Sequence, residues 1–138
     1  MKAIAAPHKH RRRQPADDRG SAAIEFAITA VAVMAIMFAA IQAATWYWAR
    51  SIALAAAQEG ADAQRAYNAD PGDGLEKANA FIASTGDGLN DATVSITGDA
   101  EQIQVTVVGR CLSVIPGFCN AVPVSATVHG TIERVTGP

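Results

Sequence analysis

Residues 26–49 read FAITAVAVMAIMFAAIQAATWYWA and carry no formal charge. As an α-helix this run is about 36 Å long at 1.5 Å per residue, which exceeds the ~30 Å hydrocarbon core of a bilayer. We therefore predict a transmembrane helix over about 26–49 that crosses with a modest tilt. The run ends in residues typical of a membrane–water interface, and we assign four of them to it: Trp46, Tyr47, Trp48 and Arg50.

Basic charge is concentrated ahead of this apolar segment. Six Lys and Arg residues and two Asp residues precede Gly20, a net charge of +4, whereas the residues after Gly20 carry a net charge of −6. The positive-inside rule therefore predicts a single-pass protein of the cytoplasmic membrane, with residues 1–20 as a basic cytoplasmic leader and the C-terminal domain outside. A nuclear-localisation or nucleic-acid-binding tail is the alternative interpretation of the basic run. The apolar segment that follows almost at once argues against it, and we expect no nucleic-acid partner.

Two other interpretations of the apolar segment are less favourable. A cleavable secretory signal with an A-x-A site at residues 53–55 would have an apolar region of only about 7–15 residues. This run is far longer and has Glu25 at its start. A core helix of a soluble protein would need a domain large enough to surround it, and residues 69–138 are too few for that.

The rest of the chain predicts an α+β domain. The long helix, assigned to residues 21–68, should continue to about Ala66, because this stretch is rich in good helix formers. A short helix is expected from Asp73, with Asp73 and Glu76 as a capping box and Gly86 as its end. We assign residues 69–138 to the extracytoplasmic domain.

Three stretches of that domain alternate apolar and polar residues with period two: residues 93–97, 102–107 and 122–133. This pattern predicts an antiparallel sheet with one covered face. The short helix or the membrane-distal part of the long helix would supply the cover. The predicted fold is thus a long N-terminal transmembrane helix followed by a small domain with a short helix and an antiparallel sheet.

Cys111 and Cys119 both lie in the part of the chain that we place outside the membrane. An even pair in an oxidising compartment is most simply a disulfide. A structural zinc site needs four ligands, and His129 is the single His after the leader. The spacing is also not the C-x-x-C of redox motifs. We therefore predict a disulfide and expect no metal or other cofactor.

The stretch Arg19–Phe26 reads RGSAAIEF and places the carboxylate of Glu25 just inside an apolar helix. An ionisable group at the edge of a membrane span is expensive, and it is a functional hypothesis by default. Two plainer interpretations remain open. Glu25 could lie among the cytoplasmic headgroups, and an acidic residue in a first helical turn is also favoured by the helix dipole.

The run from Arg19 to Arg65 resembles the TadE-like family of the tight-adherence (Tad, Flp) pilus system. The family's R-G-x-x-x-[VI]-E-F-A motif corresponds to Arg19–Ala27, its W-Y-x-R-like end to Trp46–Arg50, and its A-x-E-G-A-[RD] stretch to Ala57–Asp62. A Gly followed by a Glu at the fifth mature position is also similar to the prepilin-peptidase site of type IV pilins and pseudopilins. Two features depart from the family: this membrane helix contains no Pro, and Asp62 stands where members commonly have Arg.

The resemblance implies a pilin-like protein that an aspartic prepilin peptidase cuts between Gly20 and Ser21. The freed amine of Ser21 would meet Glu25 of a neighbouring subunit in lipid, since two buried opposite charges are tolerable only together. Glu25 and Phe26 are therefore the expected subunit-assembly residues. The implied partners are the lipid bilayer, prepilin peptidase, other pilin-like subunits and the pilus assembly platform.

We accordingly expect a minor pilin, pseudopilin or assembly component of a Tad-type pilus. The alternative is an uncleaved, membrane-anchored extracytoplasmic binding module unrelated to pili, and cleavage after Gly20 discriminates between the two. An enzyme is not expected, because the sequence shows no nucleophile–base pair, metal cluster or phosphate loop. For the same reason we expect no small-molecule substrate.

Overall fold

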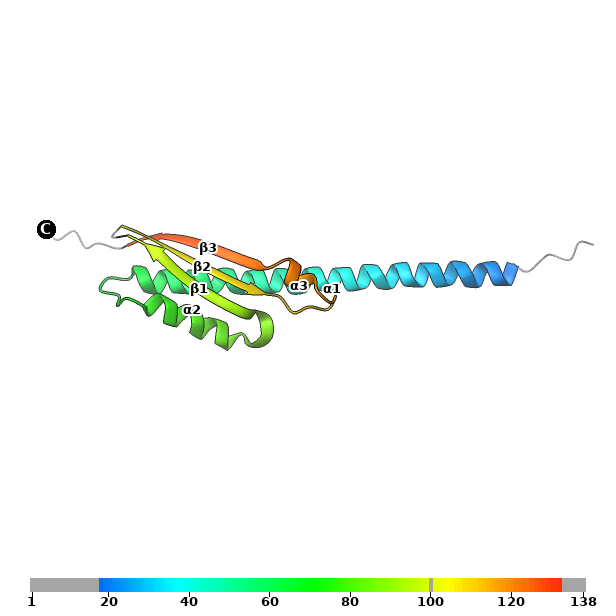
Figure 1. Cartoon of the computed structure of the whole chain (residues 1–138), viewed down its shortest axis with the longest axis horizontal. Coiled ribbons are helices and arrows are strands. Elements are labelled where there is room, and N and C mark those ends of the chain that lie inside the picture. The colour runs from blue at the N-terminus through cyan, green and yellow to red at the C-terminus, as the bar shows by residue number, and fades with distance from the viewer. Residues whose placement is uncertain (1–17, 100, 133–138) are drawn as a thin grey trace, which may run out of the picture. The chain divides into compact units, whose positions relative to one another are not determined.

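The computed structural model describes residues 18–99 and 101–132 (Figure 1). Most of the predicted basic leader, residues 1–17, lies outside the described residues. The predicted fold class is confirmed: a long apolar helix precedes a small domain with a short helix and a three-stranded antiparallel sheet. The chain divides into two compact units, residues 1–35 and 36–138, and helix α1 (Asp18–Arg65) contributes to both.

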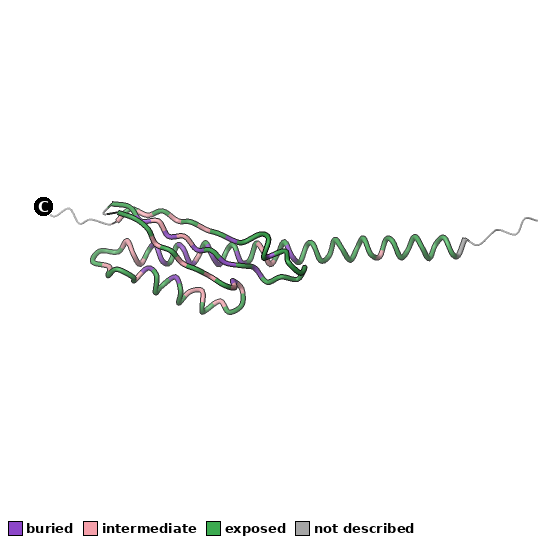
Figure 2. Tube along the Cα trace, viewed as in Figure 1, coloured by how far each residue is buried: buried purple, intermediate pink, exposed green. Residues whose placement is uncertain are grey.

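In the first unit, α1 is a bare helix. From Gly20 to Ala35 every residue is exposed except Ala30, which is intermediate (Figure 2). These exposed side chains are mostly apolar, so the described residues of this unit do not provide the burial that normally stabilises an apolar helix in water.

In the second unit, the later part of α1 packs against the domain through small side chains. Its buried residues are mostly alanines, namely Ala49, Ala53, Ala56, Ala57 and Ala61. Because alanine side chains are short, the sheet can approach the helix closely. The buried side chains of Ile103, Val105 and Val107 pack in the same core cluster as this alanine face.

Helix α2 (Asp73–Ser84) starts differently from the prediction. Its N-cap is Gly72, in the left-handed region at φ 114°, and no side chain caps the helix. The predicted capping box of Asp73 and Glu76 is therefore wrong. Asp73 Oδ2 instead accepts a hydrogen bond from the backbone N–H of Asp70 at 2.9 Å, which closes the preceding turn. The predicted end at Gly86 is confirmed, since Gly86 follows the helix at φ 64° and begins a 3₁₀ turn, η1 (Gly86–Gly88).

Helices α1 and α2 meet at two glycines. A Cβ placed on Gly60 would lie 2.9 Å from the carbonyl oxygen of Gly74, and a Cβ on Gly74 would lie 2.5 Å from the carbonyl oxygen of Gly60. Real Cβ atoms essentially never come within 3.0 Å of such an atom. The close approach of the two helix backbones therefore depends on the absence of a side chain at both positions.

The sheet contains β1 (Asn90–Gly98), β2 (Gln102–Arg110) and β3 (Val124–Thr131) in the order β1-β2-β3, all antiparallel. On the central strand, Val105 pairs with Ile96 of β1 and Val128 of β3. The segment between β2 and β3 carries the short helix α3 (Phe118–Ala121). The strand order did not follow from the period-two pattern, which specifies the faces of a strand but not its neighbours.

Asp99 holds the turn between β1 and β2, and this gives a pH-dependent prediction. Its carboxylate accepts hydrogen bonds from the backbone N–H groups of Glu101 at 2.8 Å and Gln102 at 2.9 Å. These bonds, that from Glu101 first, hold the pKa of Asp99 below its ordinary value of 3.8. The stabilisation is therefore fully present above pH 3.8 and is lost as the pH falls through the lower, folded-state pKa.

We expect an NMR titration of the Asp99 carboxyl group to give a midpoint below 3.8. In the Asp99→Asn variant, the loss of thermal stability between pH 5 and pH 2 should be smaller than in the wild type, by roughly the contribution of one carboxylate. A midpoint at or above the ordinary value would contradict this role for the turn.

Candidate functional site

The predicted processing site lies in the first unit, on the exposed surface of α1. Gly20 and Ser21 are both exposed, and Gly20 has a helical conformation. Among the described residues, a Cβ placed on Gly20 would meet no atom within 4 Å apart from its own stretch of helix. Unlike Gly60, this glycine therefore has no packing requirement from those residues, although glycine in a helix costs roughly 0.5–1 kcal/mol relative to alanine.

Glu25 and Phe26, the predicted assembly residues, are also exposed on α1, and 75% of the surface of Phe26 is accessible. Ser21 and Glu25 are four residues apart, so they lie on the same face of the helix, about one turn from each other.

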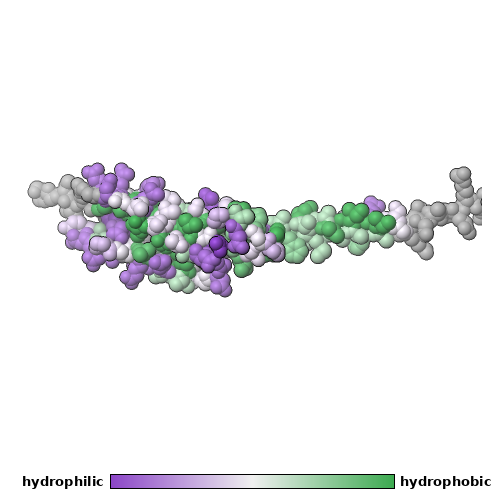
Figure 3. All heavy atoms as spheres, viewed as in Figure 1, coloured by the Kyte–Doolittle hydropathy of each residue, from purple (hydrophilic) through white to green (hydrophobic). Residues whose placement is uncertain are grey.

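The apolar part of α1 has the exposure expected of a membrane span. It is the one helix in the described residues that is long and apolar enough to cross a membrane, and none of its most apolar window is buried. Apolar residues cover this stretch of the helix in Figure 3. Its exposed large apolar side chains include Ile28, Val31 and Ile36. Soluble monomers rarely expose so large an apolar surface, and a bilayer would cover it.

The four predicted interface residues take two different positions. Tyr47 and Trp48 are exposed, at 71% and 62%. Trp46 is only partly exposed and packs against the hydrophobic core of the second unit. The guanidinium carbon of Arg50 lies 5.7 Å from the centroid of the Trp46 ring, within the range of a cation–π contact.

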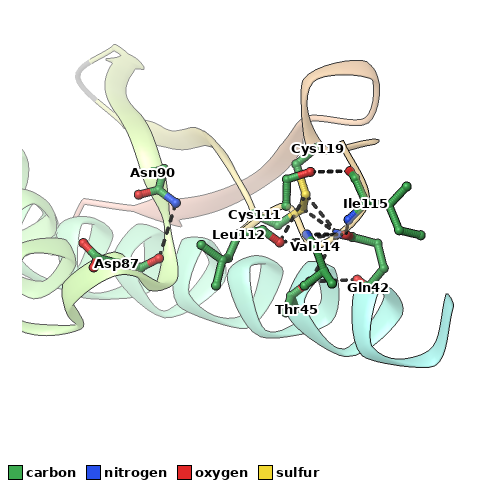
Figure 4. Close-up of a disulfide and its surroundings, with 10 residues drawn as sticks. Gln42, Thr45, Asp87, Asn90, Cys111, Leu112, Val114, Ile115 and Cys119 are labelled. Carbon is green, nitrogen blue, oxygen red and sulfur yellow. Dashed lines mark hydrogen bonds between the residues drawn. A yellow bond between two sulfur atoms is a disulfide. The ribbon is translucent and has the colours of Figure 1, made fainter. Parts of the chain in front are cut away.

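Cys111 and Cys119 form the predicted disulfide, which closes a loop between β2 and β3. The loop is attached to α1 by the side chain of Gln42 (Figure 4). Gln42 Oε1 accepts hydrogen bonds from the backbone N–H of Val114 at 2.8 Å and of Ile115 at 2.9 Å.

The amide nitrogen of Gln42 is satisfied as well. It donates to the hydroxyl of Thr45 at 3.2 Å, to the carbonyl of Leu112 at 3.4 Å and to Sγ of Cys119 at 3.1 Å. Gln42 is 1% exposed and is the one buried polar side chain among the described residues. It therefore connects the helix to the disulfide loop through both ends of its amide.

Gln42 is the residue that the sequence reasoning missed. It was visible there only as one of the few polar residues within the apolar run. A lone amide in such a run is itself a signal, because a polar group in an apolar environment needs a partner. Apart from Thr45 and Cys119, its partners are backbone groups about 70 residues away, which no local pattern identifies.

Comparison with known proteins bears on the N-terminal part of the chain. The model of the family described as "TadE-like protein" matches residues 20–62, so the resemblance predicted from the motifs is confirmed over that segment. Comparison with the curated proteins and with the solved structures gives no match. The family match indicates a protein associated with the Tad pilus, and the apolar helix supports a single-pass membrane protein.

In the part of the chain that the structure describes, no group of three or more His, Cys, Asp or Glu side chains could hold a metal ion. The TadE-like family is generally non-enzymatic.

Proposed function

We propose that this chain, which is TadE-like over residues 20–62, is a minor pilin or pseudopilin of a Tad-type pilus. It is inserted in the cytoplasmic membrane with its N-terminus inside, and prepilin peptidase cleaves it after Gly20. The α+β domain then lies outside the membrane. The positive charge ahead of the span supports this orientation.

The observation that carries the proposal is the contrast between two glycines of the matched segment. Gly60 is explained by packing, because a side chain there would collide with the backbone of Gly74. A Cβ on Gly20 would meet no other part of the described residues, 18–99 and 101–132, within 4 Å, so packing there does not explain it. Recognition by a peptidase that requires a small residue before the cut would account for Gly20. The family match begins at this residue.

Cleavage would create the charge that Glu25 needs. The new α-amine of Ser21 is positive near neutral pH, and a carboxylate in or near lipid is stable only with a partner. In an assembly of parallel helices, the amine of one subunit can meet Glu25 of its neighbour. The exposed apolar side chains of residues 26–41 would then pack against neighbouring helices or lipid.

The first test is to express the full chain with and without an active prepilin peptidase and to determine the intact mass and N-terminal sequence. We expect a chain that begins at Ser21 only when the peptidase is present. The Gly20→Leu variant should keep its leader. Ala22→Leu is the matched control, because Ala22 is also exposed on the same helix, and it should be processed like the wild type. A wild-type chain that keeps its leader beside a pilin that is cleaved would favour the uncleaved anchored module instead.

The second prediction concerns Glu25. Removing one member of a buried ion pair costs about 3–5 kcal/mol, so Glu25→Gln should reduce cross-linking to pilin-like subunits in membranes by at least about tenfold. Glu59→Gln makes the same change at an exposed position farther along α1 and should leave the cross-linking yield unchanged. Equal yields for Glu25→Gln and the wild type would contradict the assembly role.

A further inference from the structure

The disulfide loop presents an unusually apolar surface. Residues 111–128 contain no Asp, Glu, Lys, Arg or His. Four large apolar side chains of the loop are between 37% and 55% exposed: Leu112, Val114, Ile115 and Phe118. Loops exposed to water are normally rich in polar residues, so this composition favours a less polar environment.

The position of the loop along α1 suggests that environment. Gln42 holds the loop and belongs to the same compact unit. The nearest preceding charge on the helix is Glu25. In the unassembled chain no neighbouring subunit pairs with its carboxylate, so Glu25 is held outside the hydrocarbon. From Phe26 to Ile41 the bare helix is about 24 Å long at 1.5 Å per residue. This is roughly 6 Å shorter than the ~30 Å hydrocarbon core.

The hydrocarbon core therefore extends beyond the bare helix. A full ~30 Å counted from Phe26 ends near Thr45. Gln42 and the backbone segment bound to it then lie inside the outer edge of the hydrocarbon. The exposed rings of Tyr47 and Trp48 follow at the level of the headgroups, where such aromatics are favoured.

Several backbone groups of the loop are hydrogen-bonded within the protein. Non-helical backbone at membrane depth requires partners for its polar groups. The N–H groups of Val114 and Ile115 are bound by Gln42 Oε1, and the carbonyl of Ile115 accepts a hydrogen bond from Ser113 Oγ at 2.6 Å. Both polar atoms of the Gln42 side chain are bonded to the loop as well (Figure 4). Its Oε1 accepts hydrogen bonds from the two N–H groups just named, and its Nε2 donates to the carbonyl of Leu112 and to Sγ of Cys119.

We propose that the loop Cys111–Cys119 is embedded in the membrane. The side chains of Leu112, Val114 and Ile115 contact the upper acyl chains of the leaflet on the side of the α+β domain. The loop thereby supplies apolar surface over the part of the hydrocarbon core that the bare helix does not reach. It also holds the adjoining end of the α+β domain at the bilayer surface. This inference rests on the single membrane crossing and not on the pilus function.

The test uses the oxidised full chain in lipid nanodiscs with ¹³C-labelled isoleucine δ1 methyl groups. A lipid with a nitroxide at carbon 5 of its acyl chain broadens methyl signals near the top of the hydrocarbon, and a soluble gadolinium chelate broadens those exposed to water. Ile115 is assigned with the conservative variant Ile115→Val. Ile36 on the bare helix reports insertion. Ile96 packs next to Gly74, away from the disulfide loop, and is the control outside the membrane.

We expect Ile115 to lose most of its signal with the nitroxide lipid, as Ile36 does, and to keep its signal with the gadolinium chelate. Ile96 should be unaffected by the lipid. If Ile36 is broadened by the lipid while Ile115 is broadened by gadolinium alone, the loop lies in water and the inference is wrong. If Ile36 is not broadened by the lipid, the chain does not cross the membrane and the inference fails with it. Neither result concerns cleavage after Gly20, which is measured separately.

Discussion

Replacing Gly74 with Val should lower the melting temperature of the domain by about 10–20 °C, the shift expected for a loss of about 2–3 kcal/mol in a unit of this size. Even the first added carbon would lie 2.5 Å from the carbonyl oxygen of Gly60, 2.8 Å from Cβ of Gln64 and 2.9 Å from Cδ1 of Ile96. The first of these atoms is backbone of α1, so relief requires the two helices to separate. Near-UV circular dichroism of the full chain in detergent micelles would measure the change.

Ala80→Val is the matched control for this substitution. It introduces the same β-branched side chain into α2, but Ala80 is exposed, so only the small difference in helix propensity should appear, about 0.5 kcal/mol. Gly60→Val should reproduce most of the Gly74→Val effect, because each position collides with the backbone of the other. A Gly74→Val protein as stable as Ala80→Val would show that the helices do not cross at these glycines.

The elements of the fold could be predicted because each has a local period. The apolar run predicted α1. Its end at Arg65 lies one residue from the predicted Ala66 and three residues before the end of the assigned range 21–68. The alternation of residues 102–107 predicted which face of β2 is buried, and Ile103, Val105 and Val107 are indeed buried. These signals depend only on neighbouring residues, so a single sequence contains them in full.

The start of α2 shows where such local reasoning failed. Asp73 and Glu76 have the spacing of a capping box, but Gly72 adopts the N-cap position in a conformation that favours glycine. Asp73 is then inside the helix, and its carboxylate binds the backbone of Asp70. Asp73 could either cap the helix or bind the turn before it. The second arrangement is the one that accompanies the close contact of Gly74 with Gly60.

The contacts that matter most for the candidate site are the least visible in the sequence. The crossing of Gly60 and Gly74 joins two helices, and Gln42 binds a loop about 70 residues away. Both contacts join residues that are far apart in the sequence, so the periodicity of a single element does not predict them. Cys111 and Cys119 are an exception, since chemistry and compartment alone predicted their bond.

Gln42→Leu should detach the disulfide loop from α1 while leaving the core of the sheet intact. Leucine fills a similar volume but accepts no hydrogen bond, so the N–H groups of Val114 and Ile115 lose their shared acceptor. An unsatisfied buried donor costs about 1–3 kcal/mol. In micelles, amide hydrogen exchange at these two residues should therefore accelerate by about 10–100-fold. Exchange at Val105, in the core of β2, should change little.

Gln58→Leu is the matched control. It makes the same Gln-to-Leu change at a position that does not contact the loop. Gln58 is exposed on the same helix, so its replacement removes an amide without removing a partner of the loop. Unchanged exchange at Val114 and Ile115 in Gln42→Leu would mean that the disulfide alone holds the loop. Faster exchange in Gln42→Leu, with wild-type rates in Gln58→Leu, would identify Gln42 as the attachment between the helix and the loop. The polar residue that interrupts the apolar run would then be required because it joins the membrane helix to the domain beside it.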